Sequence, residues 1–206
     1  MYTGVTPAKL PDKMPAAVES SPHACFCLTE SLDICYCNSA WDRFARENGG
    51  EPNVLATSVL HKPFLQFVPE ALRANFEELF HSVRKLGRLQ SQDYECSSAN
   101  LFRLYRMQVY PLKPGSGFVV INSLRVVHPH TREVCEPDDA SYKCKLGLIH
   151  MCANCRRTRR NGDPEIWDWV PAYVERPRQD VTHTICPFCR EYYYSAYLPR
   201  AGRPPD

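Results

Sequence analysis

The sequence predicts an α+β protein in two parts. The first is an antiparallel five-stranded sheet with helices on one face, and the second is a small C-terminal module stabilised by a metal ion. Strand-like patterns stand at both ends of residues 22–130 with helical patterns between them, an order typical of such a sheet. Four of the eleven cysteines form two C-x-x-C pairs near the C-terminus, which is typical of a tetrahedral site with four thiolate ligands.

Composition narrows the class of protein. Of the 206 residues, 44% are hydrophobic, which suffices for an ordinary core, and the formal net charge of +2 gives no overall attraction to nucleic acid or anionic membranes. No run of about 18 apolar residues is present to span a membrane. Residues 1–21 lack the apolar stretch of a secretory signal, so we expect a cytoplasmic protein whose cysteines stay reduced.

The first predicted elements are a β-hairpin and a helix. The short apolar runs Ala24–Leu28 and Ile34–Cys37 are typical of two strands joined by a loop. A helix is predicted over 39–48, because Asn38 can cap its start and Gly49 stands just beyond its end.

A longer helix and three strands complete the predicted sheet. Over 69–86 apolar residues recur every three or four positions, and Gly87 follows the end of this helix. In 105–110 apolar and polar side chains alternate, as expected for a half-buried strand. The three strands are predicted at 91–97, 101–112 and 117–127.

Residues 34–50, ICYCNSAWDRFARENGG, resemble the second strand and first helix of a bacterial PAS domain. Residues 94–96 and 102–112 resemble later strands of the same family, and the resemblance covers residues 22–128. It implies a PAS-type sheet, a sensing role for a ligand or partner, and a homodimer formed through this domain. The ligand stays unknown: haem would need an axial histidine, and flavin photochemistry would need a cysteine in 61–66, where none stands.

The C-terminal part resembles a small segment found after PAS or receiver domains in bacterial signalling proteins. The shared features are MCANCRRTRR at 151–160, WDWVP at 167–171 and HTICPFC at 183–189. That segment commonly has Ser-His-Gly before its second cysteine pair, where this chain has Thr182-His183-Thr184. We expect the turn to differ there, because Gly adopts a positive φ more readily than Thr.

These observations divide the chain into five segments. We expect a flexible arm at 1–21, a PAS domain at 22–130, a polar linker at 131–146, a four-cysteine zinc module at 147–199 and a tail at 200–206.

A structural zinc ion is the predicted centre of the module. Its predicted ligands are Cys152, Cys155, Cys186 and Cys189. Four thiolates leave a charge of −2 on the site, which nearby arginines are expected to offset: Arg156, Arg157 and Arg190. Between the two pairs we expect a helical turn capped by Asp163, from which three apolar residues pack over the metal: Ile166, Trp167 and Val170.

Other chemistries for the module are less favoured. Cys186 and Cys189 as a redox pair would need a fold for which too little chain follows Cys189. The cluster Arg156–Arg160 could grip nucleic-acid phosphates, but nearby acidic residues nearly balance it. A catalytic zinc needs an open position, which four cysteines close. His183 either replaces a thiolate or hydrogen-bonds to a sulfur or to the turn.

A second cysteine cluster lies in the first hairpin. If the strands pair Cys25 with Cys37 and Cys27 with Cys35, all four sulfurs share one face of the sheet. That arrangement would suit an iron–sulfur cluster, a second metal or redox-sensing disulfides. The simpler interpretation is that these cysteines are small buried core residues, and a register slip of one residue would scatter them.

Three functional hypotheses follow, none of them catalytic. The first is a cytoplasmic regulatory protein in which the PAS domain senses a ligand or partner and the zinc module offers a surface to a protein partner of a signalling pathway. That surface is predicted to consist of Trp167, Trp169, Tyr173 and Tyr192–Tyr194. The second is a redox or oxygen sensor using the hairpin cysteines. The third is a DNA-binding regulator using Arg156–Arg160.

Overall fold

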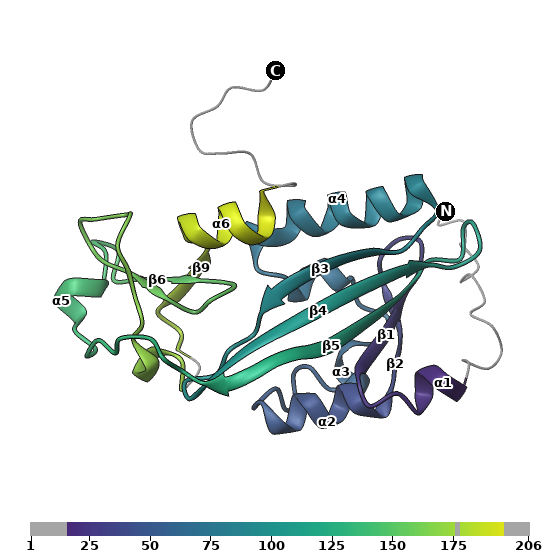
Figure 1. Cartoon of the computed structure of the whole chain (residues 1–206), viewed down its shortest axis with the longest axis horizontal. Coiled ribbons are helices and arrows are strands. Elements are labelled where there is room, and N and C mark those ends of the chain that lie inside the picture. Colours follow the sequence, from purple (N-terminus) through teal and green to yellow (C-terminus); the bar gives the residue numbers. More distant parts are fainter. Residues whose placement is uncertain (1–15, 176–177, 196–206) are drawn as a thin grey trace, which may run out of the picture. The chain divides into compact units, whose positions relative to one another are not determined.

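The computed structural model describes residues 16–175 and 178–195 (Figure 1). Its main sheet has five strands in the order β2-β1-β5-β4-β3, and the predicted antiparallel sheet with helices is confirmed. The strands are β1 (Ala24–Leu28), β2 (Ile34–Cys37), β3 (Gln90–Glu95), β4 (Leu101–Pro111) and β5 (Phe118–Pro129).

Helices occupy the positions that the sequence predicts, together with short ones that it does not. The two predicted helices are α2 (Ser39–Glu47) and α4 (Glu70–Leu86). Unexpected short elements are α1 (Ala16–Glu19), α3 (Ala56–Val59) and a 3-10 helix at Phe64–Phe67. Helix α1 lies in the expected flexible arm, whose residues 1–15 are outside the described part, as is the expected tail at 200–206.

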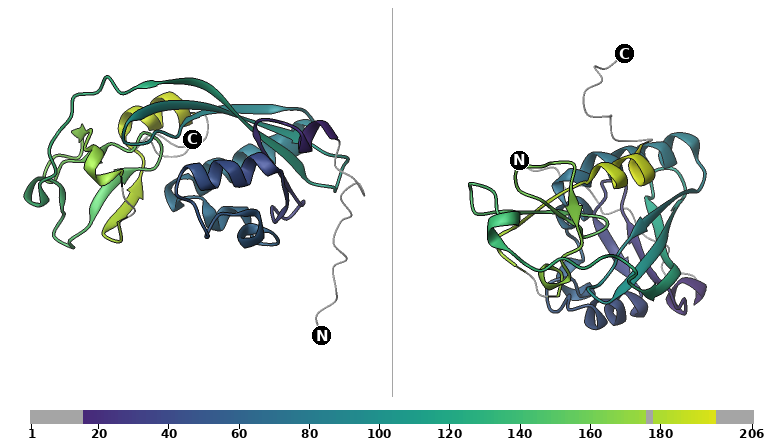
Figure 2. Two further views of the ribbon diagram at one scale, coloured as in Figure 1. Left: turned by 90° about the horizontal axis from the view of Figure 1, so that it is seen from below. Right: turned by 60° about the vertical axis from the view of Figure 1, so that its left-hand side comes forward.

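The chain forms two compact units, and the first contains the N-terminal hairpin. It comprises residues up to 67, 80–91 and 107–123. Its core is aromatic, with ring centroids of Phe26 and Phe64 5.6 Å apart and those of Phe80 and Phe118 5.1 Å apart. Helix α2 packs against β1 (Figure 2).

Asn38 fixes the start of α2 as predicted and does more. Its side-chain oxygen accepts the N–H of Trp41, which is the expected cap, and also the N–H of Cys25 at 3.0 Å. Its amide donates to the carbonyl of His23 at 2.9 Å. Because Asn38 is 1% exposed, this fully used side chain holds the helix start against the beginning of β1.

The second unit contains the cysteine segment together with part of the main sheet. It comprises 68–79, 92–106 and the chain from 124 onward. Four short strands form a small sheet in the order β8-β7-β6-β9, in which β6 and β9 run parallel. These are β6 (Ile149–Cys152), β7 (Thr158–Arg159), β8 (Trp167–Asp168) and β9 (Val181–Thr184), with helices α5 (Asp139–Tyr142) and α6 (Pro187–Tyr194).

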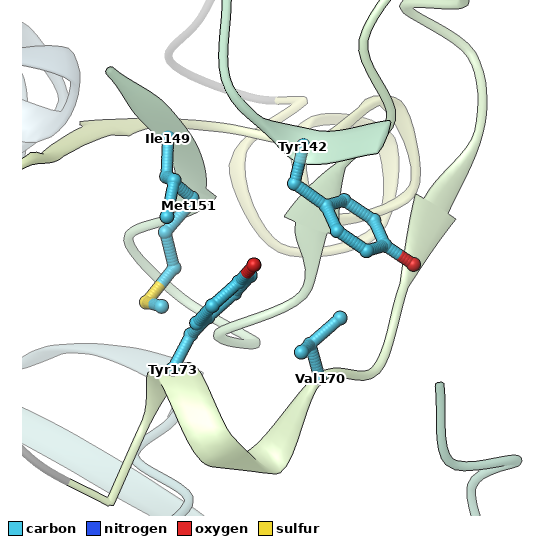
Figure 3. Close-up of a cluster of buried hydrophobic side chains, with 5 residues drawn as sticks. All are labelled: Tyr142, Ile149, Met151, Val170 and Tyr173. Atoms are coloured by element: carbon cyan, nitrogen blue, oxygen red, sulfur yellow. The ribbon is translucent and has the colours of Figure 1, made fainter. Parts of the chain in front are cut away.

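A compact hydrophobic cluster forms the core of this C-terminal part (Figure 3). It consists of Tyr142, Ile149, Met151, Val170 and Tyr173, all 4% exposed or less. The two tyrosine rings meet edge to face at 5.9 Å. Tyr142 comes from 131–146, so the segment expected as a polar linker contains a helix and supplies a core residue.

The prediction of a helical turn capped by Asp163 is wrong. Strand β8 pairs with β7, so the intervening residues form the loop of a hairpin, and Asp163 caps only a turn by accepting the N–H of Glu165. A 3-10 turn comes later, at Pro171–Tyr173. Ile166 is 37% exposed and does not pack as expected. None of the helices in 16–175 and 178–195 has the length and apolar character needed to cross a membrane.

Candidate metal centre

Four cysteine sulfurs gather at one point in the second unit. The Sγ atoms of the predicted ligands all lie within 4.8 Å of one another: Cys152, Cys155, Cys186 and Cys189. Each of these residues is 2% exposed or less. When the histidine, cysteine and acidic side chains of the described residues are considered, these four cysteines form a group that could hold a metal ion. The geometry brings together the set that the sequence predicts.

Local backbone structure positions the two pairs. Cys152 ends β6, and its amide donates to the carbonyl of Arg157 at 2.8 Å, which closes the first turn. Cys186 caps α6, and its sulfur accepts the N–H of Cys189 at 3.4 Å. Pro187 suits the first position of the helix because its missing N–H is not needed there. Parallel pairing of β6 with β9 then brings the two turns together.

The donor set fits a thiophilic ion with four tetrahedral sulfur ligands. Without an ion the sulfurs can only share protons: the pKa of Cys152 is lowered and that of Cys155 raised, chiefly because their side chains hydrogen-bond to each other. The Sγ atoms of Cys155 and Cys186 lie 3.7 Å apart. A divalent ion would stabilise all four as thiolates at about 2.3 Å, the zinc–sulfur distance.

Asn154, inside the first C-x-x-C turn, joins the centre to the main sheet. It is 1% exposed, and its amide donates to Sγ of Cys189 at 3.3 Å. Its oxygen accepts the N–H of Glu95 at 3.0 Å and the hydroxyl of Tyr194 at 2.9 Å. Glu95 is the last residue of β3, so one side chain contacts a predicted metal ligand and a strand of the sheet.

A buried ion pair strengthens the same connection. Arg132 donates to the carboxylate of Glu95 at 2.6 Å and to the carbonyl of Cys155 at 2.9 Å. Its guanidinium lies 5.0 Å from the ring centroid of Trp169. The side chains of Glu95 and Arg132 are 3% and 14% exposed. Burial raises the pKa of Glu95, while hydrogen bonding by Ser97 and the charge of Arg132 oppose that rise.

Sequence reasoning missed Asn154, Glu95 and Arg132. Asn154 offered one signal, since it is an amide side chain between two ligand cysteines. Of the predicted basic cluster, Arg156 donates to the ring of His183 at 3.1 Å and Arg160 is paired with Asp168 at 2.8 Å. His183 is absent from the four-sulfur group.

The hairpin cysteines do not have the register on which their predicted cluster depends. Cys37 stands opposite Phe26, and Cys27 stands opposite Tyr36, with an irregularity next to Cys27. The reason is the bulge, which shifts the pairing by one residue, so that Cys37 shares its face with Phe26 instead of with Cys25 and Cys27. Burial raises the pKa of all four thiols. The pKa values of Cys27 and Cys37 rise to about 12 and that of Cys35 to about 11.

The predicted aromatic surface is only partly a surface. Trp169, Tyr173 and Tyr194 are 4% exposed or less, because they pack inside the second unit. Among the described residues of the second unit, the exposed aromatics are instead Tyr192, at 70%, and Phe188, at 58%, whose rings stack 5.6 Å apart on α6. Beside them lies a shallow pocket of about 290 Å³ lined by Arg157, Glu165, Trp167, Cys186, Pro187 and Phe188.

A buried amide pair lies in the helix-and-sheet part of the second unit. Asn75 on α4 is 0% exposed and Gln92 on β3 is 7% exposed. The Asn75 amide donates to the Gln92 oxygen at 3.1 Å. Within the described residues, Asn75 Oδ1 and Gln92 Nε2 have no partner, so one acceptor and one donor remain unused there. Sequence periodicity gave no signal of this pair.

No family model and no curated protein matches the chain. Among solved structures it is similar to the phage VqmA–DPO complex, with 13% identity and a TM-score of 0.40 over 53% of this chain and 50% of that one. It is also similar to a PAS domain from a two-component sensor histidine kinase, with 16% identity and a TM-score of 0.35 over 53% of this chain and 91% of that one. A third similar structure is the PAS domain of nitrogen regulation protein NR(II) from Vibrio parahaemolyticus, with 15% identity and a TM-score of 0.33 over 53% of this chain and 95% of that one.

Proposed function

We propose that this chain is a non-catalytic regulatory protein, in which a PAS-type sheet senses a ligand and a module built on structural zinc offers a surface to a protein partner. The observation that carries the proposal is the closed set of four buried sulfurs from which α6 starts, with Phe188 and Tyr192 left in solvent. A closed shell without an open ligand position suits a structural role. A stacked, exposed aromatic pair suits protein contact.

Zinc would supply folding free energy to the module rather than reaction chemistry. The residues that would hold it are Cys152, Cys155, Cys186 and Cys189. The module's own hydrophobic cluster is small: among the described residues, five are buried and three partly buried ones pack against them. A cross-link that joins both ends of the segment would therefore add substantially to its stability.

The unused donor and acceptor of the amide pair support the sensing part. An occupant beside the pair, facing Asn75 Oδ1 and Gln92 Nε2, would need a hydrogen-bond donor next to an acceptor, as in an amide or lactam, and one water molecule also satisfies both. Leaving both groups unsatisfied would cost about 1–3 kcal/mol each. We further propose, on the sequence alone, that the protein acts in the cytoplasm as a homodimer formed through its PAS part.

The two alternatives have less support. A redox sensor built on the hairpin needs thiolates, whereas the pKa of Cys27 is raised to about 12 by burial. A DNA-binding role needs free arginines, whereas Arg160 is paired with Asp168 and Arg156 contacts His183.

Elemental analysis of the purified full chain tests the proposal. We expect one zinc per chain and no iron. Cys186→Ser should lower the zinc content and increase hydrogen exchange across 147–195, whereas Cys144→Ser, outside the four-sulfur group, should retain the metal. A metal-free wild-type chain with a fully protected C-terminal part would contradict the zinc module.

A ligand screen by thermal shift tests the sensing part. Stabilisation by a small lactam such as 2-pyrrolidone is expected to disappear in Asn75→Leu with Gln92→Leu. If the wild type and this variant respond equally to every compound, the amide pair is not a ligand site.

A further inference from the structure

We propose that metal occupancy of the four-cysteine centre is itself an input to the main sheet, transmitted through Asn154 to the end of β3. The inference rests on the proposed metal site and extends it from a structural support to a regulatory one. The effector would be a thiophilic divalent cation. The strand that responds would be β3, at Glu95.

The first step of the argument is the orientation of the Asn154 amide. A backbone N–H can only donate, so the atom that faces Glu95 N at 3.0 Å must be the oxygen. The amide nitrogen therefore faces Sγ of Cys189, at 3.3 Å. The two contacts fix one orientation together, and the hydroxyl of Tyr194 donates to the same oxygen and reinforces it.

The second step is the effect of a metal on that sulfur. Coordination makes Cys189 a thiolate, and hydrogen bonds to charged acceptors are roughly twice as strong as those between neutral groups. A bound ion therefore strengthens the contact that aims the Asn154 oxygen at Glu95. Without an ion, only weaker hydrogen bonds such as that between the Cys155 and Cys186 sulfurs hold the group together, and the amide faces a weaker acceptor.

The third step is the burial of this position from water. Asn154 is 1% exposed and Glu95 is 5% exposed, so water does not replace a lost hydrogen bond readily. Arg132 ties the Glu95 carboxylate to the carbonyl of Cys155, so displacement of the first cysteine pair also pulls on the Glu95 side chain. Both the backbone and the side chain of this strand end depend on the turn between Cys152 and Cys155.

Linkage makes the coupling reciprocal. If metal stabilises the Asn154–Glu95 contact, an ordered β3 end must increase metal affinity by the same factor. Asn154→Ala keeps all four cysteines and removes the connection, together with the acceptor of the Tyr194 hydroxyl. Loss of a group that contacts a ligand typically weakens metal binding by about 10–100-fold, and we expect a loss in that range.

Hydrogen exchange at the Glu95 amide, measured in the full-length chain, tests the proposal. In the wild type, stripping zinc with a chelator should speed exchange at Glu95 at least about tenfold. Zinc-loaded Asn154→Ala should show similar acceleration at Glu95 while exchange in β6 stays slow. Asn161→Ala, at an exposed position of the same module, should match the wild type.

Two results would overturn the inference. One is unchanged Glu95 exchange after zinc removal, and the other is unchanged exchange and zinc affinity in Asn154→Ala. A chain that purifies without metal and binds none on titration would instead refute the proposed zinc site, so the two failures are distinguishable.

Discussion

Replacing Arg132 by methionine should destabilise the protein far more than an ordinary surface change. Methionine preserves an apolar stem over Trp169 but removes the guanidinium that contacts Glu95 and the carbonyl of Cys155. The ion pair is buried, with side chains 14% and 3% exposed. Removing one partner of a buried pair costs about 3–5 kcal/mol, because it leaves the other charge without compensation.

A double-mutant cycle separates the charge from the packing. Glu95→Gln in the Arg132→Met background removes the uncompensated carboxylate, so the double variant should lose at least about 1 kcal/mol less than Arg132→Met alone. Arg106→Met is the matched control. It breaks the contact with Asp93, which lies on β3 as Glu95 does. The side chains of Arg106 and Asp93 are 41% and 32% exposed, so the loss should cost under about 1 kcal/mol.

The sign of the pH dependence gives a second readout. Burial raises the pKa of Glu95, and the loss of Arg132 would raise it further. A carboxyl whose folded pKa lies above its unfolded value contributes stability at low pH that is lost as the pH rises through the folded pKa. Arg132→Met should therefore be more destabilising, relative to wild type, at pH 8 than at pH 5.

Urea unfolding of the zinc-loaded proteins, followed by tryptophan fluorescence, measures these free energies. The reasoning fails if Arg132→Met costs no more than Arg106→Met, or if its effect is the same at both pH values.

Two further predictions concern cysteine reactivity and a turn. Iodoacetamide at pH 7.5 should label Cys144 well before Cys27. Hydrogen bonds, chiefly with the Leu148 backbone, lower the pKa of Cys144, whereas burial raises the pKa of Cys27 to about 12. Mass mapping that finds Cys27 labelled first would contradict this prediction. Gly117→Ala should lower the free energy of unfolding in urea by about 3 kcal/mol or more, because a Cβ on this residue, at φ +98°, would overlap a carbonyl oxygen of β1. Gly115, at φ +80°, faces open space, so Gly115→Ala should cost about 1 kcal/mol. Equal costs would count against the steric argument.

Local rules explain which parts of the fold the sequence predicts well. Asn38 caps α2 through contacts within three residues, and the period of apolar positions marks α4 within one residue of its observed start. The four sulfurs could be predicted because each C-x-x-C turn is local and only their meeting is not. The bulge beside Cys27 was not predictable, since one unpaired residue changes no composition or period.

Long-range polar contacts explain what the sequence could not predict. Asn154 and Glu95 are 59 positions apart, and neither residue type indicates the other. Asn75 and Gln92 come from a helix and a strand whose apolar periods predict their elements but not their polar partners. The sequence predicts Trp169 and Tyr173 on a surface, whereas both are buried. The presence of an aromatic side chain alone does not reveal which face of a short element is buried.

The positions of the four cysteines account for the exposed aromatic pair on α6. Cys186 caps this helix and Cys189 must point inward to reach the other sulfurs, so the rotation of α6 about its axis is set by the centre. With Cys189 buried, Phe188 and Tyr192 fall on the outer face, four residues apart and stacked. Their exposure is a geometric consequence of the cysteine positions, and a partner that recognises them would depend on the proposed metal ion without touching it.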